Sequence, residues 1–281
     1  MTAALALLAS LFLGIADFLG GALSRRVPQI TVLVLSQLIA TVAVIPRVVA
    51  APIGVDALPA YGWGVVSGVG AAVGVSALYR ALAIGTMGVV APISALGVLV
   101  PVAAGFVGGD TPGVLLLVGM LVAVIGTVCA SGPEIGRAPG GGGGGAQPVI
   151  LALVAALGFG TNNLAVAWGS AHDISATLLA NVLATLVIYF IAMAVLRVAH
   201  RAGGRMLVGI IAIGVLGFLA NLCFAVASES GMLSVVAVCA SVFPAVTVVL
   251  GWWLLRERLQ PVQILGVVLV LGGVALVAVA Q

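Results

Sequence analysis

The sequence contains no lysine, and charged residues of any kind make up only 6% of its 281 positions. A soluble domain carries about a quarter charged residues, because its surface must face water. Hydrophobic residues account for 63% of this chain, and its mean hydropathy is +1.39. The shortage of charge therefore excludes an ordinary soluble domain and predicts a chain whose solvent is lipid.

The same shortage excludes several kinds of partner. Ten arginines and seven acidic residues are dispersed along the chain and give a net charge of +3, which is too little for a nucleic-acid footprint. The two histidines and three cysteines have no metal-ligand spacing, and the cysteines lie inside apolar runs. We therefore expect no nucleic acid, no metal and no cofactor, and nothing in the sequence resembles an enzyme.

Long apolar runs are abundant instead. A helix needs about 20 apolar residues to cross the ~30 Å hydrocarbon core of a bilayer, and these runs are too long for strands. The first run lacks a basic segment before it and contains Asp17, so we expect a retained span rather than a cleaved signal peptide. The sequence predicts an all-α polytopic membrane protein with ten transmembrane helices, near residues 3–22, 30–50, 60–83, 88–108, 112–131, 148–168, 174–196, 205–226, 232–254 and 261–280.

One segment, GPEIGRAPGGGGGGAQP at 132–148, differs from all the others. Its six consecutive glycines cannot hold a helix, so they predict a flexible linker. The linker divides the spans five and five. We therefore expect a first repeat at 1–131, a linker at 132–147 and a second repeat at 148–281.

The two halves repeat each other in sequence. GTMGVVA at 85–91 and GMLSVVA at 231–237 lie 146 positions apart, and the same offset pairs Gly14 with Gly160. Single matches arise by chance among so many Gly, Ala and Val residues, but one offset recurs in the first, third and fourth helices of each half. We interpret this as an internal duplication. Further pairs at the same or a nearly equal offset are Asp17 with Asn163, Gly68 with Gly214, Gln37 with Asn181, Gly119 with Gly266, and Gly126 with Gly273.

The arginines orient the two repeats. Five helices is an odd number, so the second repeat enters the membrane from the opposite side to the first. Nine of the ten arginines follow odd-numbered spans, and only Arg47 lies on the other side. Because positive loops stay in the cytoplasm, we expect inverted repeats with both termini outside. The absence of lysine and the Ala, Gly, Val and Arg bias suggest a GC-rich bacterial genome, hence a bacterial cytoplasmic membrane.

Inverted repeats are a transporter architecture, in which broken helices at matching positions surround a site near the membrane midplane. The fourth predicted span contains Pro92 and Pro101, and the ninth contains Pro244. Proline frees a backbone carbonyl of the preceding turn. These residues either line a cavity or only kink helices for packing, and their occurrence in corresponding spans favours a cavity wall.

Two segments carry a family resemblance. YRALAIGTMGVVAPISALGVLVP (79–101) resembles the EamA-type transporters of the drug/metabolite transporter superfamily, and WWLLRERLQPVQILGVVLVLGGVAL (252–276) resembles their junction between helices nine and ten. The resemblance covers nearly the whole chain and implies a secondary transporter of small metabolites, often an exporter of amino acids or related compounds. One departure is that the acidic residue often found after Leu-Gly in the first repeat is carried here only by Asp110, in a shortened turn.

Asp17 is the only acidic residue well inside a predicted span. A charge at a helix centre costs about 2.5–3.5 kcal/mol on insertion scales, so its presence calls for a reason. Small multidrug transporters of the same superfamily are similar in carrying a coupling carboxylate in their first helix. We interpret Asp17 as a proton-coupling or substrate-contacting residue. The alternatives are an ion pair with Arg80 or Arg25, or a carboxylate that reaches the interface.

Other polar residues in apolar runs are further candidates for substrate binding. Amides in membrane helices join helices as often as they bind ligands. Arg80 can hold a substrate carboxylate through bidentate hydrogen bonds, or it can serve as a positive-inside anchor. The candidates besides Asp17 are Asn162, Asn163, Gln37, Asn181, Asn221, Tyr79 and Arg80.

Together these observations predict a secondary transporter that moves a small organic metabolite by alternating access. We expect a midplane cavity lined by helices one, three, four, six, eight and nine, and coupling to protons, since no nucleotide motif is present. A multidrug exporter is an alternative, although 5% aromatic residues argue against a cationic-drug pocket. A membrane scaffold is another, and it would lack a polar cavity around Asp17, Asn163 and Gln37. The expected partners are lipid, substrate and protons. Because ten helices can enclose a site alone, we expect a monomer, with a homodimer as the alternative.

Overall fold

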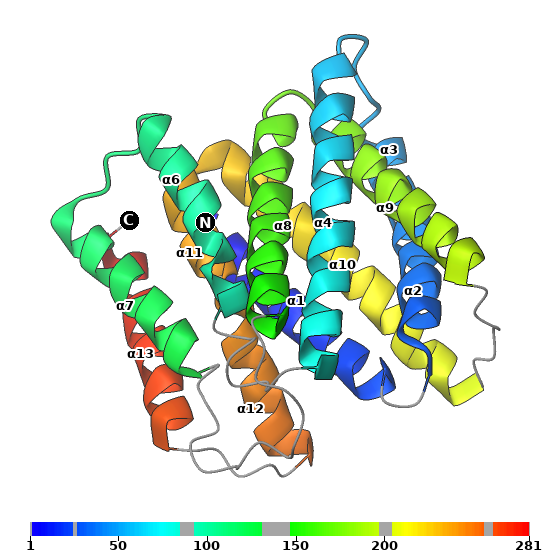
Figure 1. The fold of residues 1–281 in the computed structure, drawn as a ribbon. Helices are drawn as coiled ribbons and strands as arrows, with labels where there is room; N and C mark the ends of the chain where they lie inside the picture. Colours follow the sequence, from blue (N-terminus) through cyan, green and yellow to red (C-terminus); the bar gives the residue numbers. More distant parts are fainter. Residues whose placement is uncertain are drawn as a thin grey trace.

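The protein is an all-α polytopic membrane protein. Every regular element in the described part of the chain is helical (Figure 1). Six helices are long and apolar enough to cross a membrane, and four shorter apolar helices accompany them. The computed structural model describes residues 2–24, 27–84, 93–130, 147–196, 204–255 and 261–280.

Each of the ten predicted spans coincides with a described helical segment. Three spans are divided into two parts, and the others are continuous where they are described. In chain order the elements are α1 (Thr2–Ser24), α2 (Gln29–Ala43), α3 (Ile45–Ala50), α4 (Leu58–Ile84), η1 (Leu96–Val98), α6 (Leu99–Val107), α7 (Val114–Ala130), α8 (Gln147–Ser170), α9 (Ile174–Leu196), α10 (Gly204–Ser230), α11 (Leu233–Ala240), α12 (Phe243–Leu255) and α13 (Pro261–Ala280).

The second span is interrupted, which the sequence prediction of one run at 30–50 missed. The interruption is at Val44, between α2 and α3. Pro46 lies in the first turn of α3. Because proline has no backbone N–H and its ring crowds the turn before it, the helix cannot continue unchanged across this point. A proline near the end of an apolar run therefore ends one helix and starts the next.

The fourth and ninth spans are interrupted at matching positions. In the ninth span a turn at Ser241 and Val242 separates α11 from α12, and Pro244 is the second residue of α12. In the fourth span the 3-10 turn η1 precedes α6, in which Pro101 is buried. An offset of 146 maps the ninth-span turn onto the residues at the start of η1. Pro101 and Pro244 lie close to these turns, whereas Pro92 lies outside the described residues, and the role of these prolines in a cavity wall stays a prediction.

The principal helix pairs join the two halves of the chain. α4 packs along α8 at the front of Figure 1, α7 packs along α13 at one edge, and α1 packs along α10. α4 also packs on α9, and α10 on α2. Superposing the first half on the second makes α1 equivalent to α8, α2 to α9 and α4 to α10. The pair of α4 and α8 then corresponds to the pair of α10 and α1, and the pair of α4 and α9 to that of α10 and α2. The pairing therefore has the two-fold pattern expected of inverted repeats.

Close backbone contacts follow the same pattern. A Cβ added to Gly14 of α1 would lie 2.8 Å from the Phe243 carbonyl oxygen and 2.6 Å from Val246 Cβ. At Gly160 of α8 it would lie 2.6 Å from the Gly97 carbonyl oxygen and 2.7 Å from Val100 Cβ. All three pairs of equivalent residues are separated by 146 positions. The contact between the first and ninth spans thus recurs between the sixth and fourth.

α7 and α13 meet through two related glycine contacts. The Cβ position of Gly119 lies 3.0 Å from the Gly273 carbonyl oxygen, and that of Gly126 lies 2.9 Å from the Gly266 carbonyl oxygen. An offset of 147 exchanges these two contacts. The glycine pairs predicted from the sequence at this offset are therefore equivalent in space.

The register of the second and seventh spans needs a correction. The similarity of QLIAT and NVLAT predicted an offset of 144, which pairs Gln37 with Asn181. In the structure Gly68 packs on the carbonyl oxygen of Asn181, and the equivalent Gly214 packs on that of Ser36. The offset here is 145, so Asn181 corresponds to Ser36. Contacts fix this register, whereas a short match in an Ala-rich and Leu-rich run can slip by one residue.

Candidate functional site

Asp17 lies in α1 as a half-buried side chain inside a membrane-spanning helix. Within the described part of the chain its carboxyl group has no hydrogen-bond or ion-pair partner. Arg80, proposed as its counter-ion, is exposed near the end of α4 and does not pair with it. The other proposed counter-ion, Arg25, lies outside the described residues. The carboxyl of Asp17 is therefore not neutralised by any described basic side chain.

The turn of α1 that precedes Asp17 packs directly against α12. Thr247 Oγ1 donates a hydrogen bond to the Gly14 carbonyl oxygen over 3.1 Å and another to the Phe243 carbonyl oxygen over 3.1 Å. Only a residue without a side chain allows this approach, because a Cβ at Gly14 would collide with α12. The glycine thus fixes the position of the turn before Asp17 on the half-helix that starts after the break in the ninth span.

A second group of polar residues joins α4, α8 and α9. Ser67 Oγ donates to Asn162 Oδ1 over 3.3 Å, and Asn181 Nδ2 donates to the same oxygen over 3.2 Å and to Ser67 Oγ. Ser67, Asn162 and Asn181 are 0%, 8% and 3% exposed. We call these three residues the amide cluster. Their polar groups satisfy one another, as buried polar groups must in a membrane.

Asn163 extends from this cluster and keeps hydrogen-bonding capacity. Its Oδ1 accepts a bond of 3.2 Å from Asn162 Nδ2. Its own side-chain NH₂ has no partner among the described residues, and the side chain is half-buried. Asn163 corresponds to Asp17 at the 146 offset, so the two spans carry their free polar groups at equivalent positions.

The remaining candidates are dispersed. Gln37 Nε2 donates to the Val182 carbonyl oxygen over 3.1 Å, which ties α2 to α9. Asn221 Nδ2 donates to the Gly217 carbonyl oxygen of its own helix over 3.3 Å. Tyr79 belongs to α4, and the description of the structure does not extend to its side chain. Within the described chain, no hydrogen bond or ion pair connects Gln37, Asn221 or Arg80 to Asp17 or to the amide cluster.

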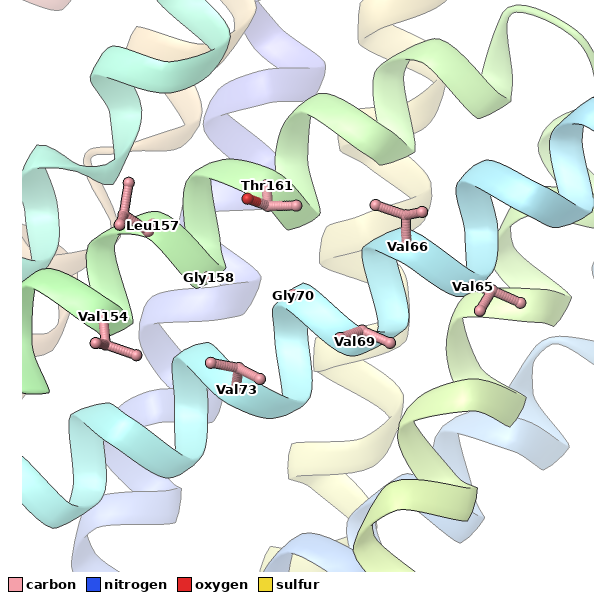
Figure 2. A pocket seen from close by; sticks show the side chains of 9 residues that line it. All are labelled: Val65, Val66, Val69, Gly70, Val73, Val154, Leu157, Gly158 and Thr161. Atoms are coloured by element: carbon pink, nitrogen blue, oxygen red, sulfur yellow. The ribbon is translucent and has the colours of Figure 1, made fainter.

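A groove of about 410 Å³ lies between α4 and α8. Figure 2 shows the two helices side by side, with Gly70 and Gly158 facing each other and valines along the rim. Apart from the Thr161 hydroxyl the lining side chains are apolar. None of the candidate residues lines this groove, so the polar midplane cavity expected from the sequence stays a prediction. The lining residues are Val65, Val66, Val69, Gly70, Val73, Val154, Leu157, Gly158 and Thr161.

Two contacts in the structure could not be predicted from the sequence. Ser67 holds the amide cluster together, yet an isolated serine in a Gly-rich run gives no signal of such a role. Trp63 and Trp168 meet edge to face with ring centroids 4.9 Å apart and planes at 70°. Their positions at the start of α4 and the end of α8 would have predicted this contact only once the antiparallel pairing was known.

Comparison with known proteins agrees with this architecture. Residues 147–279 match the EamA-like transporter family. The second half of the chain is thus similar to this family. The EamA match begins at the first residue of α8 and includes all five spans of the second half.

A solved structure has a fold similar to that of the whole chain. It is a crystal structure of a protein. The alignment covers 98% of the present chain and 99% of the chain in that crystal structure, with a TM-score of 0.75. At 19% identity the similarity shows the fold, including that of the first half, which the family match does not reach. No curated protein matches the chain.

Proposed function

We propose that this chain is an EamA-type transporter of the drug/metabolite transporter superfamily, and that it exports a small zwitterionic metabolite, similar to an amino acid, in exchange for protons. The proposal assigns the two halves, 1–131 and 148–281, as repeats joined by the linker 132–147. It places both termini outside a bacterial cytoplasmic membrane, following the arginine distribution. Alternating access would expose one site first to the cytoplasm and then to the other side.

The observation that carries the proposal is the unpaired carboxyl of Asp17 in α1. An ionisable group inside a membrane is costly and marks an ion or substrate pathway unless it is neutralised by a partner. When ionised, the carboxylate can pair with a substrate ammonium group. The free NH₂ of Asn163, at the equivalent position of the second half, can donate to a substrate carboxylate. Together the two groups suit a zwitterion.

Proton coupling follows from the use of one carboxyl group for two ligands. Asp17 can hold either a proton or a substrate ammonium group, so the two compete for it. Substrate entering from the cytoplasm displaces the proton, and a proton arriving from outside displaces the substrate. The proton gradient then drives export without a nucleotide.

The test measures proton release on addition of amino acids and common metabolites to detergent-solubilised protein. The expected result is that one class of solute releases protons from the wild type and none from Asp17→Asn. Asp56→Asn is the matched control, because Asp56 is exposed before α4 and makes no bond to the described residues. It is expected to release protons as the wild type does.

Other outcomes decide between the alternatives. If both wild type and Asp17→Asn bind the same solute without proton release, Asp17 is structural and the coupling proposal is wrong. Proton release by lipophilic cations, with none by zwitterions, would instead identify a multidrug exporter. Failure of every solute to bind or release protons would favour a scaffold without transport.

A further inference from the structure

Both chain ends lie on one face of the membrane domain, which we call the terminal face. Ten spans is an even number, so the start of α1 and the end of α13 are on the same side. Because successive spans alternate in direction, this face also carries four connections. They are α3 to α4, α6 to α7, α8 to α9, and α10 to α11.

One large apolar core fills most of the terminal half of the molecule, and a small separate cluster of Ala57, Ala60 and Ala176 joins the starts of α4 and α9 there. The large core contains Ala3 and Ala6 at the start of α1, Phe224 near the end of α10, and the buried face of α11. The ends of α2 and α8 and the starts of α7 and α9 join the same cluster. Nearly every span therefore contributes its terminal-side part to a single packed layer.

The opposite half is packed differently. There the described buried residues form four separate clusters, each joining only two or three spans. In addition α8 packs on α10, whereas the equivalent pair α4 and α1 makes no comparable contact among the described residues. Among the described residues, buried packing is thus more continuous at the terminal face than on the other side. The clusters are represented by Tyr189, Val242, Ile210 and Ala81.

Polar contacts close the terminal face across the two halves. Asp110, in the α6–α7 connection, accepts bonds from the backbone N–H of Ser234 over 2.8 Å and from its hydroxyl over 2.7 Å. These bonds fall at the first turn of α11, where a carboxylate is favoured by the helix dipole. Gly105 packs against both residues, so the carboxylate is held in place. Charge-assisted bonds of this kind are about twice as strong as neutral ones.

A second set of contacts lies on the same face. Asp173 Oδ2 accepts a bond from the Gly54 N–H over 2.9 Å, and Ser175 Oγ donates to the Ala51 carbonyl oxygen over 2.7 Å. They tie the α8–α9 connection and the start of α9 to the α3–α4 connection. Both sets join a segment of the first half to one of the second.

The inverted copies of these contacts cannot form on the opposite face. At the offset of 146, Asp110 corresponds to Arg256 and Ser234 to Gly88. At the offset of 145, Asp173 and Ser175 correspond to Pro28 and Ile30. These replacements remove both carboxylates and both hydroxyls. These two sets of contacts therefore have no equivalent on the opposite face.

We infer that the contacts of Asp110 with Ser234, and of Asp173 and Ser175 with the α3–α4 connection, latch the terminal face in the resting state. Access to the site is then from the opposite face. With the predicted orientation that face is cytoplasmic, so the resting transporter is ready to load the substrate that it exports. The inference rests on the proposed function, since a latch has meaning only for a chain that alternates between two states.

Spin-label distances test the latch. In a chain with Cys129, Cys223 and Cys239 replaced by alanine, labels are placed at Val107 and Ser230, which are exposed at the terminal-side ends of α6 and α10. Asp110→Ala is expected to raise the population with a longer label distance about tenfold. That factor corresponds to about 1.4 kcal/mol, the scale of hydrogen bonds to a charged group.

The controls separate the latch from general damage and from the transport proposal. Asp56→Ala, on the same face, is expected to leave the label distances unchanged. Ser234→Ala keeps the bond from its backbone N–H to Asp110, so it is expected to give a smaller shift than Asp110→Ala. It also serves as a second test of the latch if Asp110→Ala does not fold. Unchanged Val107–Ser230 distances in both Asp110→Ala and Ser234→Ala would overturn the latch. Labels at Leu196 and Leu254, exposed on the opposite face, report the reciprocal closure. Opening of the terminal face without that closure would support the latch and count against alternating access.

Discussion

At the scale of single residues, the amide cluster shows how polar groups are accommodated in an apolar bundle. Ser67 both donates and accepts, so the two buried asparagines on either side of it share a satisfied network. The equivalent positions in the other half carry no such network. Asn162, Ser67 and Asn181 correspond there to Ala16, Ile213 and Ser36, at offsets of 146, 146 and 145. The cluster therefore stabilises only the bundle of α4, α8 and α9.

Asn181→Ala is expected to lower stability by about 1 kcal/mol. The substitution leaves Asn162 and Ser67 each without one bond in a site that water does not reach. Thermal unfolding in detergent measures the effect. Asn221→Ala is the matched control and should cost less, because the Asn221 amide bonds only to its own helix. Equal losses in the two variants would show that the cluster adds nothing specific.

The sequence identified the candidate polar residues but could not say how each is used. Asp17, Asn162, Asn163 and Asn181 are conspicuous because amides and carboxyls are rare in apolar runs. Which of them is satisfied depends on distances between helices, and no pattern along one helix contains these distances. For the same reason the free groups of Asp17 and Asn163 could be separated from the bonded ones only in three dimensions.

At the scale of helices, α4 uses small residues on two faces. Gly64 and Gly68 pack on the backbone of α9, and Gly70 and Gly74 pack on that of α8. Glycine at each position lets the neighbouring backbone approach more closely than a side chain would allow. One helix can therefore contact two partners over much of its length.

Gly70→Ala is expected to destabilise the protein by about 1–3 kcal/mol through overpacking. The added Cβ would lie 2.8 Å from the Gly158 carbonyl oxygen, and backbone atoms cannot give way cheaply. Gly62→Ala, in the same helix, is the control, since nothing lies within 4 Å of its Cβ position. The two melting temperatures are compared in one detergent. Similar values would mean that α4 and α8 can separate at no cost.

Helix positions could be predicted well because the length of an apolar run and its flanking turns determine a span. Prolines indicated the breaks of the fourth and ninth spans, although Pro46 was overlooked because it lies near the end of its run. Helix pairing could be predicted only through the repeat, since lipid-facing and protein-facing valines look alike in sequence. The groove between α4 and α8 is an example, because its walls are mostly valine.

At the scale of the whole molecule, most packing is between the halves. The pairs α4 with α8, α7 with α13 and α1 with α10 all cross from one half to the other. Packing within a half is limited by comparison, as between α8 and α9 or α1 and α2. Neither half can therefore bury its own helix faces alone.

Separate expression of residues 1–131 and 148–281 tests this dependence. We expect the two fragments to co-purify as one complex when they are produced together, because their main contacts do not need the connecting chain. Each fragment produced alone is expected to aggregate or be degraded. The measurement is co-purification through a tag on one fragment. A fragment that is monodisperse by itself would contradict the expectation.

The antiparallel pairing of α1 with α10, two spans that begin about 200 residues apart, has a consequence for biogenesis. A ribosome makes the chain from its N-terminus, so α1 and α4 enter the bilayer well before their partners exist. During that interval they must persist as single helices in lipid, which helices with few charges can do. Assembly is then completed only when the last spans have been inserted, and the unpaired early helices are the species most exposed to quality-control proteases.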